Sequence, residues 1–128
     1  MRGFLKKVEL PLITLKEMSS LRNLIQAIER SEFAYQLYLK DKKYFQAIRI
    51  YSSNKLIYNI LESMLLEDNG LDKKKIINFL FHLDDWFSQF NEAVESRSFG
   101  LNDTFVFERI EGMFPFPKDF ISELKDQL

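Results

Sequence analysis

Several residue types that shape many small domains are scarce or missing in this sequence. It has no cysteine, so disulfide bonds and thiolate metal ligands are excluded. Glycine and proline number only 4 and 3. All-β domains need many turns and usually contain more of both, so the scarcity favours helices.

Long hydrophobic segments are missing too. The longest almost unbroken apolar run covers residues 76–83, which is far too short to cross a bilayer. Residues 1–15 contain a short apolar run that Glu9 and Pro11 interrupt, and no small-residue cleavage site follows. We therefore expect a cytoplasmic protein with no membrane association.

The residues that are present are typical of a globular chain. Hydrophobic residues make up 46% and charged residues 29% of 128 residues, which is enough for one domain, 1–128, with a buried core. Phenylalanine occurs 13 times, and most of these rings lie in the second half of the chain. A core built on them would be large for the length of the chain.

The charges are unevenly distributed. Residues 1–60 contain 11 Lys/Arg and 5 Asp/Glu, whereas residues 61–128 contain 7 and 14. One interpretation is that the two halves fold together and their fields cancel. The other is that an acidic surface of the folded protein meets a basic partner.

Apolar residues at three- and four-residue steps predict three long helices. The first starts at a capping box formed by Thr14 and Glu17 and extends to about residue 39. The second covers about 42–67, and its apolar face rotates at residues 52–54, so it is either broken there or buried on two sides. The third is capped by Asp72 and reaches about residue 96. We predict an all-α fold, an antiparallel bundle of three long helices with two short C-terminal elements.

The stretch LYLKDKKYFQAIRIY, residues 37–51, resembles the turn between the two helices of a tetratricopeptide repeat. Tyr38, Tyr44, Ala47, Ile48 and Tyr51 occupy positions where that repeat places packing residues. The resemblance covers about a fifth of the chain, departs from the repeat at Asn54, and does not recur 34 residues later. It implies a helical hairpin.

The C-terminal third allows two interpretations. Residues 103–111 are predicted to form either a short helix or a short strand that pairs with residues 8–12, and we favour the helix because a lone strand pair is weak. A final helix is predicted to begin at Pro117.

The third helix has two different sides when its residues are placed at steps of about 100°. Its core stripe contains Ile76, Leu80, Leu83, Phe87, Phe90 and Val94. The opposite side is acidic and carries two apolar residues, so we predict that it binds a partner. The predicted partner-binding residues are Ile77, Phe81, Asp84, Asp85, Glu92 and Glu95. Alternatively, another helix covers Phe81 and Ile77 as a second packing face.

No residue pattern indicates catalysis, a metal or a cofactor. His82, the only histidine, could act as a base oriented by Asp85, but no nucleophile is coupled to it. Asp84 and Asp85 point about 100° apart on a helix, so they do not converge on one substrate bond. We expect no enzymatic activity, no metal and no cofactor.

Recognition of another protein is the function that these features favour. We expect a small bacterial-style inhibitor, of the immunity or antitoxin type, that neutralises a basic enzyme through an acidic, aromatic-rich face. The alternatives are a structural subunit of a larger assembly and a nucleic-acid-binding subunit. The second would use the basic residues Lys40, Lys42, Lys43, Arg49, Lys73, Lys74 and Lys75.

Overall fold

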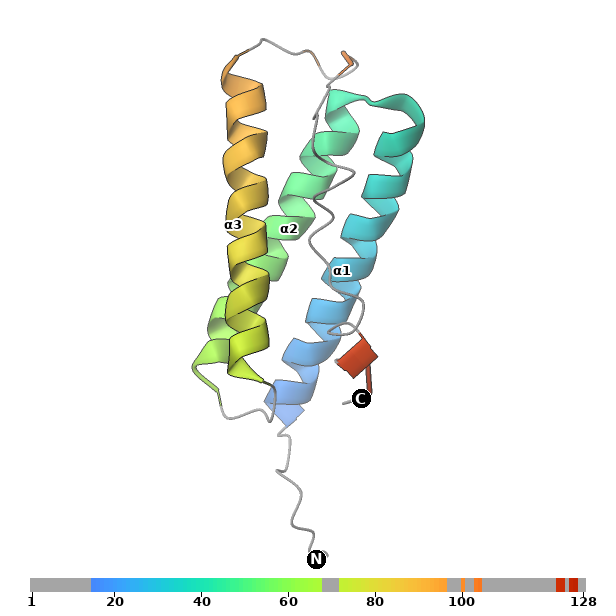
Figure 1. Cartoon of the computed structure of the whole chain (residues 1–128). Coiled ribbons are helices and arrows are strands. Elements are labelled where there is room, and N and C mark those ends of the chain that lie inside the picture. Colours follow the sequence, from blue (N-terminus) through green and yellow to red (C-terminus); the bar gives the residue numbers. More distant parts are fainter. Residues whose placement is uncertain are drawn as a thin grey trace, which may run out of the picture.

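The computed structural model describes residues 15–67, 72–96, 100, 103–104, 122–123 and 125–126. It contains helices α1 (Leu15–Asp41), α2 (Tyr44–Leu65) and α3 (Lys73–Glu95). Each helix runs opposite to the preceding one (Figure 1), so the predicted all-α antiparallel bundle of three long helices is confirmed. The described part of the chain contains no strand, only an isolated antiparallel bridge between Lys43 and Thr104.

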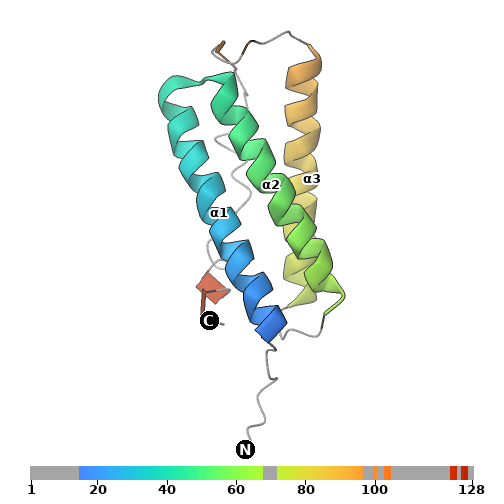
Figure 2. The same cartoon turned by 180° about the vertical axis from the view of Figure 1, so that it is seen from behind.

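Helix α2 is the middle helix of the bundle, with α1 and α3 on either side of it (Figure 2). Its buried residues are Ala47, Ile50, Asn54, Ile57, Leu61 and Met64. Between α2 and α3 the core is aromatic. Trp86 stacks on Phe90 with ring centroids 5.2 Å apart, and Tyr51 lies 4.9 Å from Phe90 and 5.2 Å from Phe87. These rings bury a large apolar area and give the α2–α3 interface a fixed geometry.

The predicted rotation of the apolar face of α2 does not break the helix. Residues 52–54 are helical, and α2 continues without interruption to Leu65. Of the two predicted alternatives, the structure therefore shows one helix that packs on two neighbours. Before residue 52, the sequence predicts an apolar stripe of Tyr44, Phe45, Ile48 and Tyr51. This stripe is wrong in one respect, because Phe45 is 45% exposed, whereas Ala47 and Ile50 are buried.

The buried polar residue Asn54 joins α2 to α1. Its side-chain oxygen accepts a hydrogen bond from the Ser31 hydroxyl at 2.6 Å, and neither residue is exposed. The Asn54 amide nitrogen has no hydrogen-bond partner. Asparagine favours helix ends over helix interiors, so this tertiary hydrogen bond is what offsets the local preference.

The turn between α1 and α2 consists of Lys42 and Lys43 and gives the expected helical hairpin. Lys42 has a φ of 54°, the left-handed conformation that commonly ends a helix, and its N–H donates to the Tyr38 carbonyl at 2.7 Å. The Asp41 carboxylate accepts from the Lys43 N–H at 3.0 Å. At the start of α2, the Tyr44 N–H donates to the Asp103 carbonyl at 2.8 Å, which ties this turn to the chain beyond α3.

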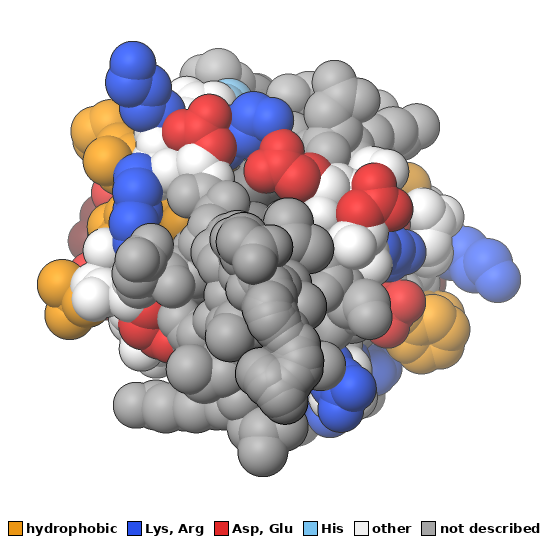
Figure 3. All heavy atoms as spheres, turned by 90° about the horizontal axis from the view of Figure 1, so that it is seen from below, with side chains coloured by type: hydrophobic (Ala, Val, Ile, Leu, Met, Phe, Trp, Pro, Cys, Tyr) orange, Lys and Arg blue, Asp and Glu red, His pale blue; other side chains and the backbone are white. Residues whose placement is uncertain are grey.

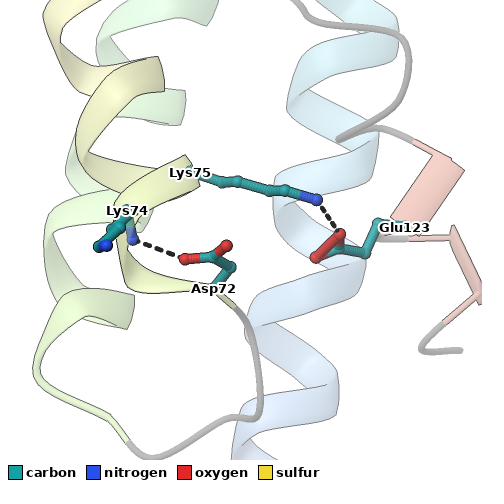
Figure 4. A network of polar contacts seen from close by, with 4 residues as sticks. All are labelled: Asp72, Lys74, Lys75 and Glu123. Atoms are coloured by element: carbon teal, nitrogen blue, oxygen red, sulfur yellow. Dashed lines mark hydrogen bonds and ion pairs between the residues drawn. The ribbon is translucent and has the colours of Figure 1, made fainter.

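Asp72 and Lys73 make polar contacts at the start of α3, and those of Lys73 reach the end of α2. The predicted N-cap is confirmed, because the Asp72 carboxylate accepts from the Lys74 N–H at 2.9 Å (Figure 4). The Lys73 ammonium donates to the carbonyls of Met64 at 3.1 Å and Leu65 at 2.9 Å, and also to that of Glu67. Lys73 therefore caps the C-terminal end of α2, where the last carbonyl groups of a helix have no following turn to supply N–H donors.

We expect Lys73→Met to lower the free energy of unfolding by about 1–2 kcal/mol, because it removes a charged donor from these carbonyls while keeping a side chain of similar length. Lys74→Met is the matched control, since Lys74 is the exposed neighbour in the same turn. Urea denaturation of the two variants measures the difference. Equal stability of both variants would show that water replaces Lys73 without cost.

The predicted C-terminal elements lie largely outside the described residues. Thr104 is bridged to Lys43, and residues 122–123 and 125–126 are helical, while residues 105–121 and 8–12 are not described. Glu123 forms an ion pair with Lys75 at 2.7 Å, which attaches this end of the chain to the start of α3 (Figure 4). Both side chains are partly exposed, so the pair contributes little to stability.

Candidate functional site

The outer side of α3 carries all six predicted partner-binding residues on the surface. Phe81 is 66% exposed and Ile77 is 42% exposed. Asp84, Asp85, Glu92 and Glu95 are exposed as well. Among the helices that the structure describes, none covers Phe81, and residues 105–121 lie outside the described part of the chain.

The opposite side of α3 is the core face, as predicted. Its buried residues are Ile76, Phe79, Leu80, Leu83, Trp86, Phe87 and Phe90, whereas Val94 is half-buried. Asp84 leaves the helix beside the core face, about 80° from Ile76, and Asp85 leaves it on the far side, so they interrupt an apolar sequence without placing a charge in the core. This explains why two aspartates are tolerated beside the single tryptophan.

The six residues form a long stripe rather than one compact site. At about 1.5 Å per residue, Ile77 and Glu95 are about 27 Å apart along the helix axis, and Phe81 and Glu92 about 16 Å. Phe81 has Ile77 one turn before it and Asp84 and Asp85 one turn after it, whereas Glu92 and Glu95 lie near the C-terminus of α3. A partner that covers the whole stripe would therefore need an extended contact surface.

Helix α2 places Tyr58 beside Asp84, with Glu62 one turn further along α2. The Tyr58 hydroxyl donates to the Asp84 carboxylate at 3.4 Å. Burial raises the pKa of Tyr58, and so do the hydrogen bond to Asp84 and the negative charges of Asp84 and Glu62. The sequence alone did not indicate that Tyr58 belongs to this surface, because only the antiparallel pairing of α2 and α3 brings it to Asp84.

Lys55 marks one limit of the acidic surface. Its ammonium lies 5.1 Å from the Phe87 ring centroid and 6.0 Å from that of Tyr58, so it covers the exposed edge of the aromatic interface. Moving along α2 from Lys55 to Tyr58 and Glu62, the surface charge changes from positive to negative. The acidic part of the surface lies on the Glu62 side of Tyr58.

His82 and Asp85, considered above as a possible catalytic pair, both lie on the exposed surface of α3. His82 is exposed, and the Asp85 carboxylate accepts a hydrogen bond from the Gln89 amide at 3.4 Å. Within the ranges the structure describes, no group of three or more His, Cys, Asp or Glu side chains could hold a metal ion.

Several of the basic residues considered for nucleic-acid binding make contacts within the protein. Lys73 binds carbonyls of α2, Lys75 pairs with Glu123, and the Lys42 ammonium lies 5.2 Å from the Tyr38 ring centroid. The Arg49 guanidinium bonds to Gln46 and lies 6.0 Å from the Phe45 ring centroid. Phosphate binding through these side chains would have to replace the existing contacts.

Other large hydrophobic side chains are also exposed in the described part of the chain: Phe33, Phe45, Leu56 and Leu66. Phe33, on α1, is 59% exposed, which is close to the value for Phe81. Seen from below, hydrophobic side chains lie mainly toward the edges of the bundle, with charged side chains of both signs between them (Figure 3). Isolated exposed rings are common in globular proteins. Phe81 differs from Phe33 in its charges, because Asp84 and Asp85 lie one turn away with no Lys or Arg within a turn, whereas Phe33 has Arg30 as well as Glu29 and Glu32 within a turn.

None of the helices α1 to α3 combines the length and the apolar composition that a membrane span requires. In comparisons with known proteins, this chain matches no family model, no curated protein and no solved structure.

Proposed function

We propose that this chain is a non-catalytic protein that binds a basic partner protein through the outer side of α3. The observation that carries the proposal is the 66% exposure of Phe81 beside Asp84 and Asp85. An aromatic side chain that a partner can bury supplies binding energy, and carboxylates around it select and attract a basic surface.

The finer form of the proposal is an inhibitor of the immunity or antitoxin type that neutralises a basic enzyme. Its support is the small size of the chain and the excess of 14 Asp/Glu over 7 Lys/Arg in residues 61–128. Acidic residues along α3 would accelerate encounter with a positively charged cleft. Nucleic-acid binding has less support, because several of the relevant basic side chains already make intramolecular contacts.

Affinity capture from the source cells tests the proposal when wild type is compared with Phe81→Ala and Phe33→Ala. We expect Phe81→Ala to weaken binding by about 2 kcal/mol or more, as loss of a central anchor does, and Phe33→Ala to have no effect. The two variants lose the same ring from similarly exposed positions. A partner that both variants retain equally well would contradict binding through α3.

Association kinetics then test the role of charge. Replacing Asp84 and Asp85 by lysine should mainly slow association, and more at low salt than at high salt, because screening weakens long-range attraction. Stopped-flow or surface-based measurement of the association rate at several salt concentrations provides the comparison. A rate that does not depend on salt would argue against a basic partner.

A further inference from the structure

The most distinctive part of the α3 surface is where α2 joins it. We define the Phe81 patch as Ile77, Phe81 and Asp84 of α3 with Tyr58 and Glu62 of α2. Ile77, Phe81 and Asp84 follow one another at steps of four and three residues, so they share one side of α3. The hydrogen bond from Tyr58 to Asp84 connects the two helices within the patch.

Because α2 and α3 are antiparallel, Glu62 of α2 lies level with the part of α3 that precedes Asp84. Tyr58 lies opposite Asp84. Glu62 is one turn beyond Tyr58 toward the C-terminus of α2. Since α3 runs in the opposite direction, this position is level with Leu80 and Phe81, one turn before Asp84. The negative charge of Glu62 also acts on the Tyr58 hydroxyl. Glu62 of α2 is thus level with Phe81 along the helix pair, and Asp84 lies about one turn from Phe81 along α3.

The chemistry of this arrangement suits arginine better than lysine. A guanidinium is planar, so it can lie on an aromatic ring while its edge donates two hydrogen bonds to a carboxylate. Tyr58 donates to one oxygen of Asp84, and because Asp84 is exposed, a partner's guanidinium can reach this carboxylate from solution. A lysine ammonium is a strongly hydrated point charge and gains less from an exposed ring.

We propose that the partner contacts this patch through an arginine side chain that lies on the Phe81 ring and pairs with Asp84, with Glu62 supplying additional negative charge. The proposal rests on the proposed function, since it specifies the group that a basic partner presents to α3. Charge complementarity between the carboxylates and the guanidinium identifies the occupant, and the exposed phenyl ring distinguishes it from other cations.

Short synthetic peptides test this without knowledge of the partner. The probe is a peptide with several arginines and one leucine, and the matched peptides carry lysine or citrulline in place of each arginine. Citrulline has nearly the shape of arginine but no charge. Amide signals of the isotope-labelled full chain, followed by nuclear magnetic resonance during titration, report both the affinity and the location of binding.

We expect the arginine peptide to shift signals of residues 58, 62, 77, 81 and 84 and to bind about threefold tighter than the lysine peptide, as an exposed cation–π contact allows. The citrulline peptide should not bind. Phe81→Ala should remove the preference for arginine over lysine, whereas Phe33→Ala should preserve it. Asp84→Asn should weaken binding of both charged peptides.

Equal affinity of the arginine and lysine peptides at the patch would overturn the choice of arginine and leave the proposed function intact. The same would follow if none of the peptides shifted these signals while capture of the partner still depended on Phe81. Equal binding of the citrulline peptide would show that the carboxylates contribute nothing, and it would count against both proposals.

Discussion

Replacing Phe87 by alanine is expected to lower the free energy of unfolding by about 3–5 kcal/mol, the usual loss for a buried ring. Phe87 is 9% exposed and lies between Tyr51, 5.2 Å away, and Trp86, 5.4 Å away, measured between ring centroids. Removing the ring would leave a cavity between α2 and α3 that these large, rigid side chains cannot easily fill.

Phe81→Ala is the matched control on the same helix, because the same atoms are removed from a side chain that is 66% exposed. We expect Phe81→Ala to change the free energy of unfolding by less than about 0.5 kcal/mol, as most surface substitutions do. Thermal and urea melts of the two variants measure both values. If Phe81→Ala unfolds as readily as Phe87→Ala, Phe81 is a packing residue and the binding surface proposed for α3 does not exist.

The two sides of α3 could be predicted from the sequence because helical periodicity determines them. Ile76, Leu83 and Phe90 recur every seven residues and are buried, while Phe81 and Asp85 leave the helix on the other side. The cap at Asp72 was predictable for a similar reason, since an N-cap acts within its own first turn. Features that depend on local spacing could therefore be predicted from the sequence alone.

Contacts between helices could not be predicted from the spacing of residues in the sequence. Nothing in the sequence showed that Lys73 binds carbonyls of α2 or that Tyr58 reaches Asp84, because both contacts depend on how α2 and α3 pair. Asn54 is the clearest example: its type suggested a helix break, and the Ser31 hydroxyl, 23 positions away in the sequence, holds it in the middle of α2. Propensity is a weak guide where a tertiary hydrogen bond competes with it.

Asn54→Asp is expected to have the second large effect, because it would place a carboxylate where no side-chain surface is exposed. The Ser31 hydroxyl can still donate one hydrogen bond to it, but a neutral hydroxyl does not compensate a buried negative charge. Burial would raise the pKa of the new carboxyl group in the folded protein above its value of about 4 in the unfolded chain. We expect Asn54→Asp to lower the free energy of unfolding by about 3 kcal/mol or more at neutral pH.

The direction in which the stability of Asn54→Asp changes with pH shows whether the buried charge causes its loss of stability. A group with a raised pKa in the folded state favours folding below its unfolded pKa and loses that contribution as the pH rises through the folded value. The difference in stability between wild type and Asn54→Asp should therefore be smallest near pH 4 or below, since about that value the unfolded carboxyl also binds its proton. Urea denaturation of both proteins across the acidic to neutral range measures this difference. A deficit that does not change with pH would show that the loss comes from altered packing.

Asn54→Leu separates the cost of the charge from the value of the hydrogen bond. Leucine has a similar size and removes the amide nitrogen that has no partner. The Ser31 hydroxyl can then bond to a backbone carbonyl one turn earlier in α1, as helical serines do. We expect Asn54→Leu to be within about 1 kcal/mol of wild type, because replacing an incompletely satisfied buried polar group by an apolar one is close to neutral. If it is instead as unstable as Asn54→Asp, the bond between Ser31 and Asn54 is what holds α1 and α2 in register.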